Sequence, residues 1–350
     1  MEEKRFLKIL EKALSKRASD IHISVNLPPV LRIDGKLSIM EDEEKFSVKD
    51  LEGLTRIILT REKFDKFREN GEIDFAYSVS GLGRFRVNLY LQRGTPALAI
   101  RTISDKIPSF EELEIPSILK NFALMEKGLI IVTGPTGTGK STTLAAMIDY
   151  INKERNCHII TIEDPIEYLH RHNKSIIHQR ELGEDTRSFD RALVSALRED
   201  PDVIMIGEMR DLNTMAAAIT AAETGHLVMS TLHTSSAAGA IERIIDIFPP
   251  HQQNQIRVQL SDILLCVVAQ KLLPKEDGEG RVAAFEILIA TPAVKNLIRE
   301  GKTHQLFSAI QTGARFGMQT MEQAIQNLFQ RGLISKEVHD KHIAELSFIQ

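Results

Sequence analysis

The stretch Gly128-Leu-Ile-Ile-Val-Thr-Gly-Pro-Thr-Gly-Thr-Gly-Lys-Ser-Thr-Thr143 decides the fold. Its apolar run, Leu129 to Val132, is typical of a strand that is buried on both faces. The residues from Gly134 to Ser141 match the pattern G-x-x-x-x-G-K-S, and apolar residues follow at helical spacing. The stretch therefore predicts a strand, a phosphate-binding loop and a helix, in that order.

The residue types of this loop suit a nucleotide triphosphate and its metal ion. Glycines let the backbone curl so that successive N–H groups point at phosphate oxygens, and the helix adds its positive dipole end. Lys140 can neutralise the outer phosphates, and the Ser141 hydroxyl can ligate Mg2+. We expect ATP and Mg2+ as cofactors, with the nucleotide held by Gly134, Pro135, Thr136, Gly137, Thr138, Gly139, Lys140, Ser141 and Thr142.

The bulk composition is that of a globular protein without a strongly charged partner. The chain has 350 residues and a net charge of −4, so no overall basic field indicates nucleic acid binding. Its two cysteines, Cys157 and Cys266, are too far apart for a CxxC metal site and suggest a reducing compartment. No signal peptide or membrane span is apparent, so we expect a soluble, cytoplasmic protein.

We expect a smaller N-terminal α+β domain, PAS-like in type, over residues 1–105. Its pattern predicts an amphipathic first helix, an alternating strand from Ile21, a hairpin at Asp34-Gly35 and a helix from Val48 to Asn70. Asp20 and His22 read as a turn-capping pair or as a contact on a neighbouring subunit. The segment 106–117 contains prolines and several charges, which predicts a linker, and residues 118–350 follow as the ATPase domain with a helical end.

Three arginines of the first domain are candidate catalytic residues. Phe85, Val87, Leu89 and Leu91 alternate inward on one predicted strand, so Arg84 and Arg86 share its outer face, and the partner strand carries Arg101. A solvated sheet face is one interpretation. The other is an arginine finger that acts on a neighbour's nucleotide, because arginine is suited to stabilising charge on a transferring phosphoryl group.

Two acids end buried strands of the second domain. His158 to Ile162 runs into Glu163, which is placed to orient or deprotonate an attacking water. Val203 to Gly207 runs into Glu208, the position of a second acid that holds Mg2+ or its waters. Because Glu208 is longer than the usual Asp, we expect it to reach the metal through a water.

Histidines stand at both ends of a further strand, His226 and His233. His233 lies at the carboxyl end, the ligand-binding edge of a parallel sheet, which suggests that it senses the γ-phosphate; His226 is a weaker candidate for the same role. A purely structural role is the alternative for both. Strands alternating with helices around the phosphate loop imply a RecA-like parallel sheet, so the expected fold class is α/β.

Four motifs together resemble those of the secretion-superfamily ATPases, which power type IV pili and type II secretion. They are Gly-Pro-Thr-Gly-Thr-Gly-Lys-Ser-Thr, Ile-Glu-Asp-Pro-Ile-Glu, Ile-Met-Ile-Gly-Glu-Met-Arg-Asp and Gly-His-Leu-Val-Met-Ser-Thr-Leu-His-Thr. A short N-terminal domain, the absence of the four-cysteine insert of the assembly ATPases and the segments 293–300 and 317–321 make the chain most similar to the PilT-type retraction ATPases. A PilU-type paralogue remains an alternative assignment.

The resemblance implies a homohexameric ring in which each nucleotide lies between one core and a neighbour's N-terminal domain. It implies Glu163 as catalytic glutamate, Glu208 as second acid, His226 and His233 as a histidine box, and first-domain arginines near the nucleotide. Domain rotation would turn a platform protein at the cytoplasmic face of the inner membrane and disassemble the pilus. The alternatives are an assembly or type II secretion ATPase, a RecA-like nucleic-acid ATPase and a nucleotide-gated adaptor.

Overall fold

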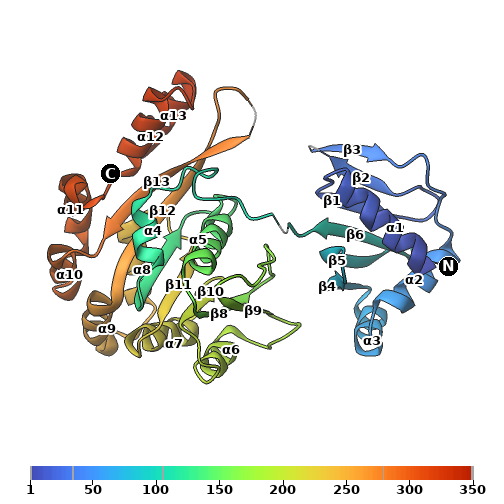
Figure 1. The fold of residues 1–350 in the computed structure, drawn as a ribbon, viewed down its shortest axis with the longest axis horizontal. Helices are drawn as coiled ribbons and strands as arrows, with labels where there is room; N and C mark the ends of the chain where they lie inside the picture. The colour runs from blue at the N-terminus through green and yellow to red at the C-terminus, as the bar shows by residue number, and fades with distance from the viewer. Residues whose placement is uncertain (1, 34, 105, 279, 348–350) are drawn as a thin grey trace. The chain divides into compact units, whose positions relative to one another are not determined.

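The computed structural model describes residues 2–33, 35–104, 106–278 and 280–347. It divides into two compact units, residues 1–106 and residues 107–350 (Figure 1). Among the described residues, no helix has both the length and the apolar character needed to cross a bilayer.

The first unit is built on a six-stranded antiparallel sheet in the order β3-β2-β1-β6-β5-β4. Inward residues of the strands, such as Ile21 and Phe85, pack with Phe6 and Leu54 of the helices in one buried cluster. The elements are α1 (Glu2–Ser15), β1 (Asp20–Ile23), β2 (Val30–Ile33), β3 (Lys36–Ile39), α2 (Val48–Ile58), α3 (Arg61–Asn70), β4 (Glu72–Val79), β5 (Gly83–Gln92) and β6 (Thr95–Thr102).

The second unit is built on a seven-stranded sheet in the order β13-β12-β7-β11-β10-β8-β9. All neighbouring pairs are parallel except β12 and β13. Its strands are β7 (Gly128–Thr133), β8 (His158–Glu163), β9 (Ile176–Glu181), β10 (Val203–Ile206), β11 (Leu227–Leu232), β12 (Leu264–Pro274) and β13 (Arg281–Ile289).

Helices cover both faces of this sheet, as strands buried along their whole length, such as β7 and β11, require (Figure 1). Alternate residues of β7 face opposite ways: Ile130 packs in a cluster with α4 and α5, whereas Ile131 packs in a cluster with α6 to α9. The helices are α4 (Ile118–Ala123), α5 (Lys140–Glu154), α6 (Phe189–Ala196), α7 (Leu212–Glu223), α8 (Ala237–Asp246), α9 (Pro250–Ile263), α10 (Pro292–Arg299), η1 (Thr303–Gln305), α11 (Leu306–Thr312), η2 (Ala314–Phe316), α12 (Met321–Gln330) and α13 (Lys336–Ser347).

The predicted α/β class with a parallel sheet is confirmed. Several local expectations are wrong. The single helix expected from Val48 to Asn70 is two helices, because Leu59 is extended and the Thr60 side chain caps α3. Leu91 does not face inward but is 46% exposed. The sequence also missed two whole strands, β4 and β9.

Further expectations concern Asp20 and His22, the linker and the first domain. Asp20 and His22 do not form a turn cap, because both lie within β1. Most of the segment predicted as a linker belongs to the second unit, where Phe110 and Ile115 are buried in a core cluster. The PAS-like character of the first domain stays a prediction. The hairpin residue Asp34 lies outside the described residues.

Candidate functional site

The phosphate loop joins the end of β7 to the start of α5, in the arrangement that the sequence predicts. Gly134 has φ +151°, and a Cβ added there would lie 2.5 Å from the backbone oxygen of Gln270. A side chain at Gly134 would therefore meet both backbone strain and a steric clash. Gly139, the residue before α5, has φ +85°, so it too favours glycine.

Lys140 lies in the hollow of this loop. Its side chain is buried, and Nζ donates hydrogen bonds to the backbone oxygens of Gly134 at 2.7 Å and Pro135 at 3.0 Å. Burial lowers the pKa of Lys140, while the carboxylates of Glu208 and Glu167 act in the opposite direction. The ammonium group is therefore held by the backbone of the loop and is influenced by carboxylates that follow β8 and β10.

The strand order sets out the predicted residues along one edge of the sheet. Since neighbouring strands are parallel, the loop after β7, the turn after β11 and the turns after β10 and β8 all emerge at the same edge. The Thr133 hydroxyl, at the end of β7, donates to the backbone oxygen of Thr234 at 2.8 Å. This contact joins the phosphate loop to the segment that carries His233.

Glu208 links the next two strands on this edge. Its Oε2 accepts a hydrogen bond from His233 Nε2 at 3.1 Å, and its Oε1 pairs with Arg210 Nε at 2.6 Å. The bond from His233 requires the proton on Nε2. Each carboxylate oxygen therefore has a protein partner, and contact of Glu208 with a metal ion through a water stays a prediction.

Glu163 ends β8, next to β10. Ile162 and Ile206 are directly paired, and Gly207 N–H donates to the Ile162 oxygen at 2.7 Å. A Cβ at Gly207 would lie 3.4 Å from Glu163 Cα, which shows how closely the two acid-bearing turns approach. The two predicted acids thus come from adjoining strands.

The Glu163 carboxylate is almost fully buried and is held by neighbours that sequence reasoning missed. Its Oε1 accepts hydrogen bonds from Thr161 Oγ1 at 2.7 Å and from Gln179 Nε2 at 3.2 Å. Burial raises the pKa of Glu163 to about 7, while the bonds from Thr161, Gln179 and the Glu167 backbone act to lower it. An acid with a pKa near neutrality can exchange protons at physiological pH.

His226 is not on this edge. It precedes β11, its backbone oxygen accepts from Gly128 N–H at 3.0 Å, and its Nδ1 lies 2.8 Å from the Ala221 oxygen. Because β11 runs parallel to β7, His226 lies where β7 begins, about 20 Å from the strand ends that carry the loop and His233. Within one chain, the structure therefore separates His226 from the other predicted residues.

The three arginines belong to the first unit. Arg86 and Arg101 are directly paired across β5 and β6, which puts them on one face as predicted. Arg101 Nε donates to Asp20 Oδ1 at 3.0 Å, and Arg84 Nη1 donates to Ser78 Oγ at 3.0 Å. Burial acts to raise the pKa of Asp20, but the hydrogen bonds from Ser19 and Arg101 outweigh it, so the pKa lies below its usual value.

A cavity of about 360 Å³ opens beside the phosphate loop. Its lining joins Gly139 and Thr142 of the loop and helix to Glu112 of the predicted linker and to the β12–β13 hairpin, from which Arg281 reaches the Gly137 oxygen at 3.4 Å. Sequence reasoning gave no sign of this cavity, because its walls come from three distant segments.

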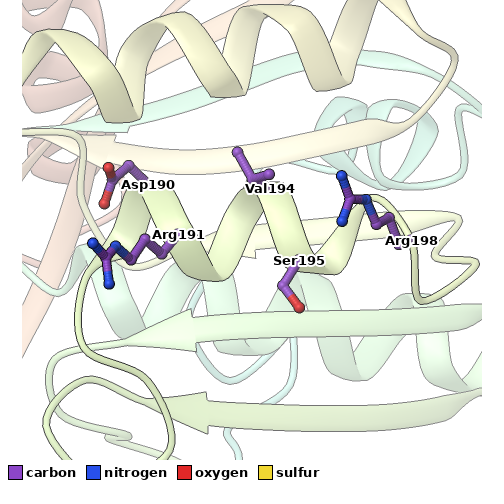
Figure 2. Close-up of a pocket in the computed structure, with 5 residues that line it drawn as sticks. All are labelled: Asp190, Arg191, Val194, Ser195 and Arg198. Atoms are coloured by element: carbon purple, nitrogen blue, oxygen red, sulfur yellow. The ribbon is translucent and has the colours of Figure 1, made fainter.

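A second hollow, of about 340 Å³, lies along α6 and includes none of the predicted residues. Figure 2 shows its lining side chains spaced along that one helix and the turn after it, with Asp190 and Arg191 at one end and Arg198 at the other. The lining residues are Asp190, Arg191, Val194, Ser195 and Arg198.

Comparisons with known proteins show which family this chain resembles. The family model of the type II/IV secretion system proteins matches residues 2–340. The type IV pilus retraction ATPase PilT of Pseudomonas aeruginosa is 48% identical over 320 residues, which cover 91% of this chain and 92% of PilT. The type IV pilus ATPase PilU of the same species is 44% identical over 332 residues, which cover 95% of this chain and 87% of PilU.

The fold is also similar to that of a solved structure. A crystal structure of the pilus retraction motor PilT with bound ADP has a TM-score of 0.88 and 49% sequence identity, and the match covers 95% of each chain. The fold described above, with its parallel sheet, is therefore the fold of this solved retraction motor. The chain belongs to the type II/IV secretion system protein family.

Proposed function

We propose that this chain is an ATP-hydrolysing motor that retracts type IV pili. The observation that carries the chemical part is the shared sheet edge, on which the phosphate loop, Glu208 and Glu163 emerge from parallel strands. Support for the biological part comes from the relatives, one of which is named as the type IV pilus retraction ATPase PilT and is similar over nearly its whole length.

Each residue of the edge has a role that suits its surroundings. Lys140 and the loop N–H groups neutralise and orient the phosphates. Ser141 would supply a hydroxyl to Mg2+ and Glu208 would hold the ion's waters, since hard oxygen donors of this kind fit Mg2+. Glu163, with a pKa of about 7, takes the proton of the attacking water.

The arginines are the part of the proposed site that needs a neighbouring copy. In the proposed hexameric ring, Arg84, Arg86 or Arg101 of one subunit stabilises the charge that develops on the nucleotide of the next, a contribution worth about 10³–10⁵-fold in related chemistry. Motor action then requires a platform protein at the cytoplasmic face of the inner membrane, against which the ring acts.

Deletion of the gene in its own organism tests the direction of force. We expect excess surface pili and loss of twitching. The intact gene should return both to normal, whereas the Lys140→Ala variant should not. Cells without pili would instead indicate an assembly ATPase, and normal pili with normal twitching would contradict the proposal.

Mixing two inactive variants tests whether an arginine acts across subunits. Each of the three arginines is changed to Ala in turn, with Arg93→Ala in the β5–β6 turn as the matched control. When an inactive arginine variant is mixed with Lys140→Ala, rings that pair an intact loop with an intact arginine should recover part of the ATP turnover. No recovery for any arginine, or full activity of all three single variants, would contradict a role in trans.

A further inference from the structure

Gln179 lies on β9, the edge strand that the sequence did not predict, and its amide group makes three contacts with the residues around Glu163. Nε2 donates to Glu163 Oε1 at 3.2 Å and to the backbone oxygen of Tyr168 at 2.8 Å. Oε1 accepts from the backbone N–H of His170 at 2.8 Å. With both donors and its acceptor in use, the amide has one fixed orientation.

Thr161 completes the arrangement from within β8. Its side chain is fully buried, and its hydroxyl donates to the same Glu163 oxygen that Gln179 contacts. Two neutral donors from adjoining strands therefore converge on one carboxylate oxygen. Hydrogen bonds of this kind stabilise the ionised carboxylate and restrict its rotation.

We propose that Gln179 and Thr161 are positioning residues, which orient the Glu163 carboxylate toward the attacking water and keep it ionised when hydrolysis needs a base. The inference rests on the proposed function and extends it to residues outside the recognised motifs. Neither residue contacts the nucleotide in this assignment; both act through Glu163.

The surroundings of Glu163 make such donors necessary. The carboxylate is buried, and burial favours its neutral form. The acids near it are Glu167 in the following turn, Glu181 at the end of β9, which accepts from Ile166 N–H, and Glu208 after β10. Among the groups that shift the pKa of Glu163, the neutral donors are therefore the ones that oppose burial.

A purely structural role predicts something different. Gln179 also ties the segment 168–170 to β9, so its loss could lower activity through local disorder. That effect would reduce turnover at every pH. Loss of a donor to the carboxylate would instead raise the pKa of Glu163 and move the acid limb of the pH–rate profile, because only the ionised form accepts the proton.

Thr161→Val and Thr161→Ser form the sharpest pair of variants. Valine keeps the shape of threonine and suits a buried strand but removes the hydroxyl, whereas serine keeps it. We expect Val to move the acid limb of kcat upward by about one pH unit, which is tenfold in turnover at a pH below the limb, and Ser to restore the wild-type position.

Gln179→Met gives the second variant, since methionine is similar in length but donates no hydrogen bond. We expect an upward shift of the acid limb of similar size. Gln255→Met, at an exposed position on α9, is the matched control and should leave the profile in place. Uniform loss of kcat with an unmoved acid limb, in both Thr161→Val and Gln179→Met, would overturn the proposal.

A measurement without turnover keeps the test valid if the variants are inactive. Isotope-edited infrared difference spectra against Glu163→Gln report the protonation of this one carboxyl group, and the titration midpoint should rise in Thr161→Val. An unchanged midpoint would overturn the proposal. Substantial ATP turnover by Glu163→Gln would instead count against the proposed base itself, so the two failures are distinguishable.

Discussion

The phosphate loop and the surroundings of Glu163 meet on one sheet edge, yet they are built in different ways. The loop is a local structure: its backbone turns at Gly134 and Gly139, and Lys140 bonds to oxygens five and six residues before it. The Glu163 carboxylate is held by side chains, one of them Gln179, sixteen residues further along the chain and on another strand.

The difference shows what a motif can and cannot specify. Backbone N–H groups bind phosphate wherever the loop adopts its conformation, so a short pattern of glycines and one lysine is enough. The ionisation of a buried acid depends on every group around it, and those groups are brought together by tertiary structure. The predictions below test this contrast, from the largest expected effect to the smallest.

Lys140→Ala should have the largest effect, because it removes the one side-chain cation of the loop. We expect ADP and ATP binding to be lost at concentrations that saturate the wild type, and turnover to become undetectable. Lys153→Ala, further along the same helix and ion-paired with Asp149, is the matched control. Tight nucleotide binding by Lys140→Ala would show that the loop is not the phosphate site.

Glu163→Gln should separate binding from chemistry. We expect ATP affinity close to that of the wild type, and hydrolysis lower by about two or more powers of ten. Glu154→Gln, at the end of α5, serves as the control and should hydrolyse normally. If the two variants turn over ATP alike, the contrast between a binding region and a chemical region fails.

The same substitution should also change how the stability of the protein depends on pH. The pKa of Glu163 is higher in the folded state than in the unfolded state, so folding takes up a proton between the usual glutamate pKa and about pH 7. The stability of the wild type therefore falls as pH rises through this window, because the buried carboxyl group becomes charged. The Glu163→Gln variant is neutral at every pH. Its free energy of unfolding, measured with urea, should therefore increase relative to that of the wild type as pH rises from about 5 to 8, by on the order of 2 kcal/mol. A constant difference across this range would contradict the raised pKa.

Gly134→Ala tests the local construction of the loop. The added Cβ would meet the Gln270 oxygen and would hold a residue at φ +151°, which together cost on the order of 1–3 kcal/mol in stability. Gly183→Ala shares a positive φ but has no atom within 4 Å of its Cβ, so it should lose less. Thermal unfolding with and without ADP measures both; equal losses would mean that the clash at Gly134 is unimportant.

Tyr168→Phe should have the smallest effect. The Tyr168 hydroxyl lies 3.1 Å from Thr142 Oγ1, beside the phosphate loop, while its backbone oxygen accepts from Gln179. Removal of one partly buried hydrogen bond is worth about 1 kcal/mol, so we expect less than a tenfold change in turnover and no change in the acid limb. A shift of that limb would show that the two regions are more tightly coupled than their separate construction suggests.

The sequence predicted what depends on neighbours along the chain. The loop, the buried strands that precede Glu163 and Glu208, and the parallel sheet all follow from short patterns. β9 escaped because His178-Gln179-Arg180-Glu181 is a polar run without apolar alternation, so its strand character comes from pairing with β8. With β9 unseen, Gln179 could not be found as a neighbour of Glu163.

Long-range side-chain pairs were out of reach for the same reason. Asp20 and Arg101 are 81 residues apart, and only the pairing of β1 with β6 brings them together. The two histidines that flank β11 show the converse case: the sequence suggested the same role for both, whereas the length of the strand separates His226 from His233.

The Asp20–Arg101 pair has a consequence for the proposed action of Arg101 on the nucleotide of a neighbouring subunit. Arg101 is 68% exposed, and ion pairs at such sites contribute little net free energy, so Asp20 holds the guanidinium in place without trapping it. When a neighbour's triphosphate comes within reach, exchange of one anionic partner for another would need little activation. In the proposed ring, Asp20 would therefore hold Arg101 ready until a neighbour's nucleotide replaces it as the anionic partner.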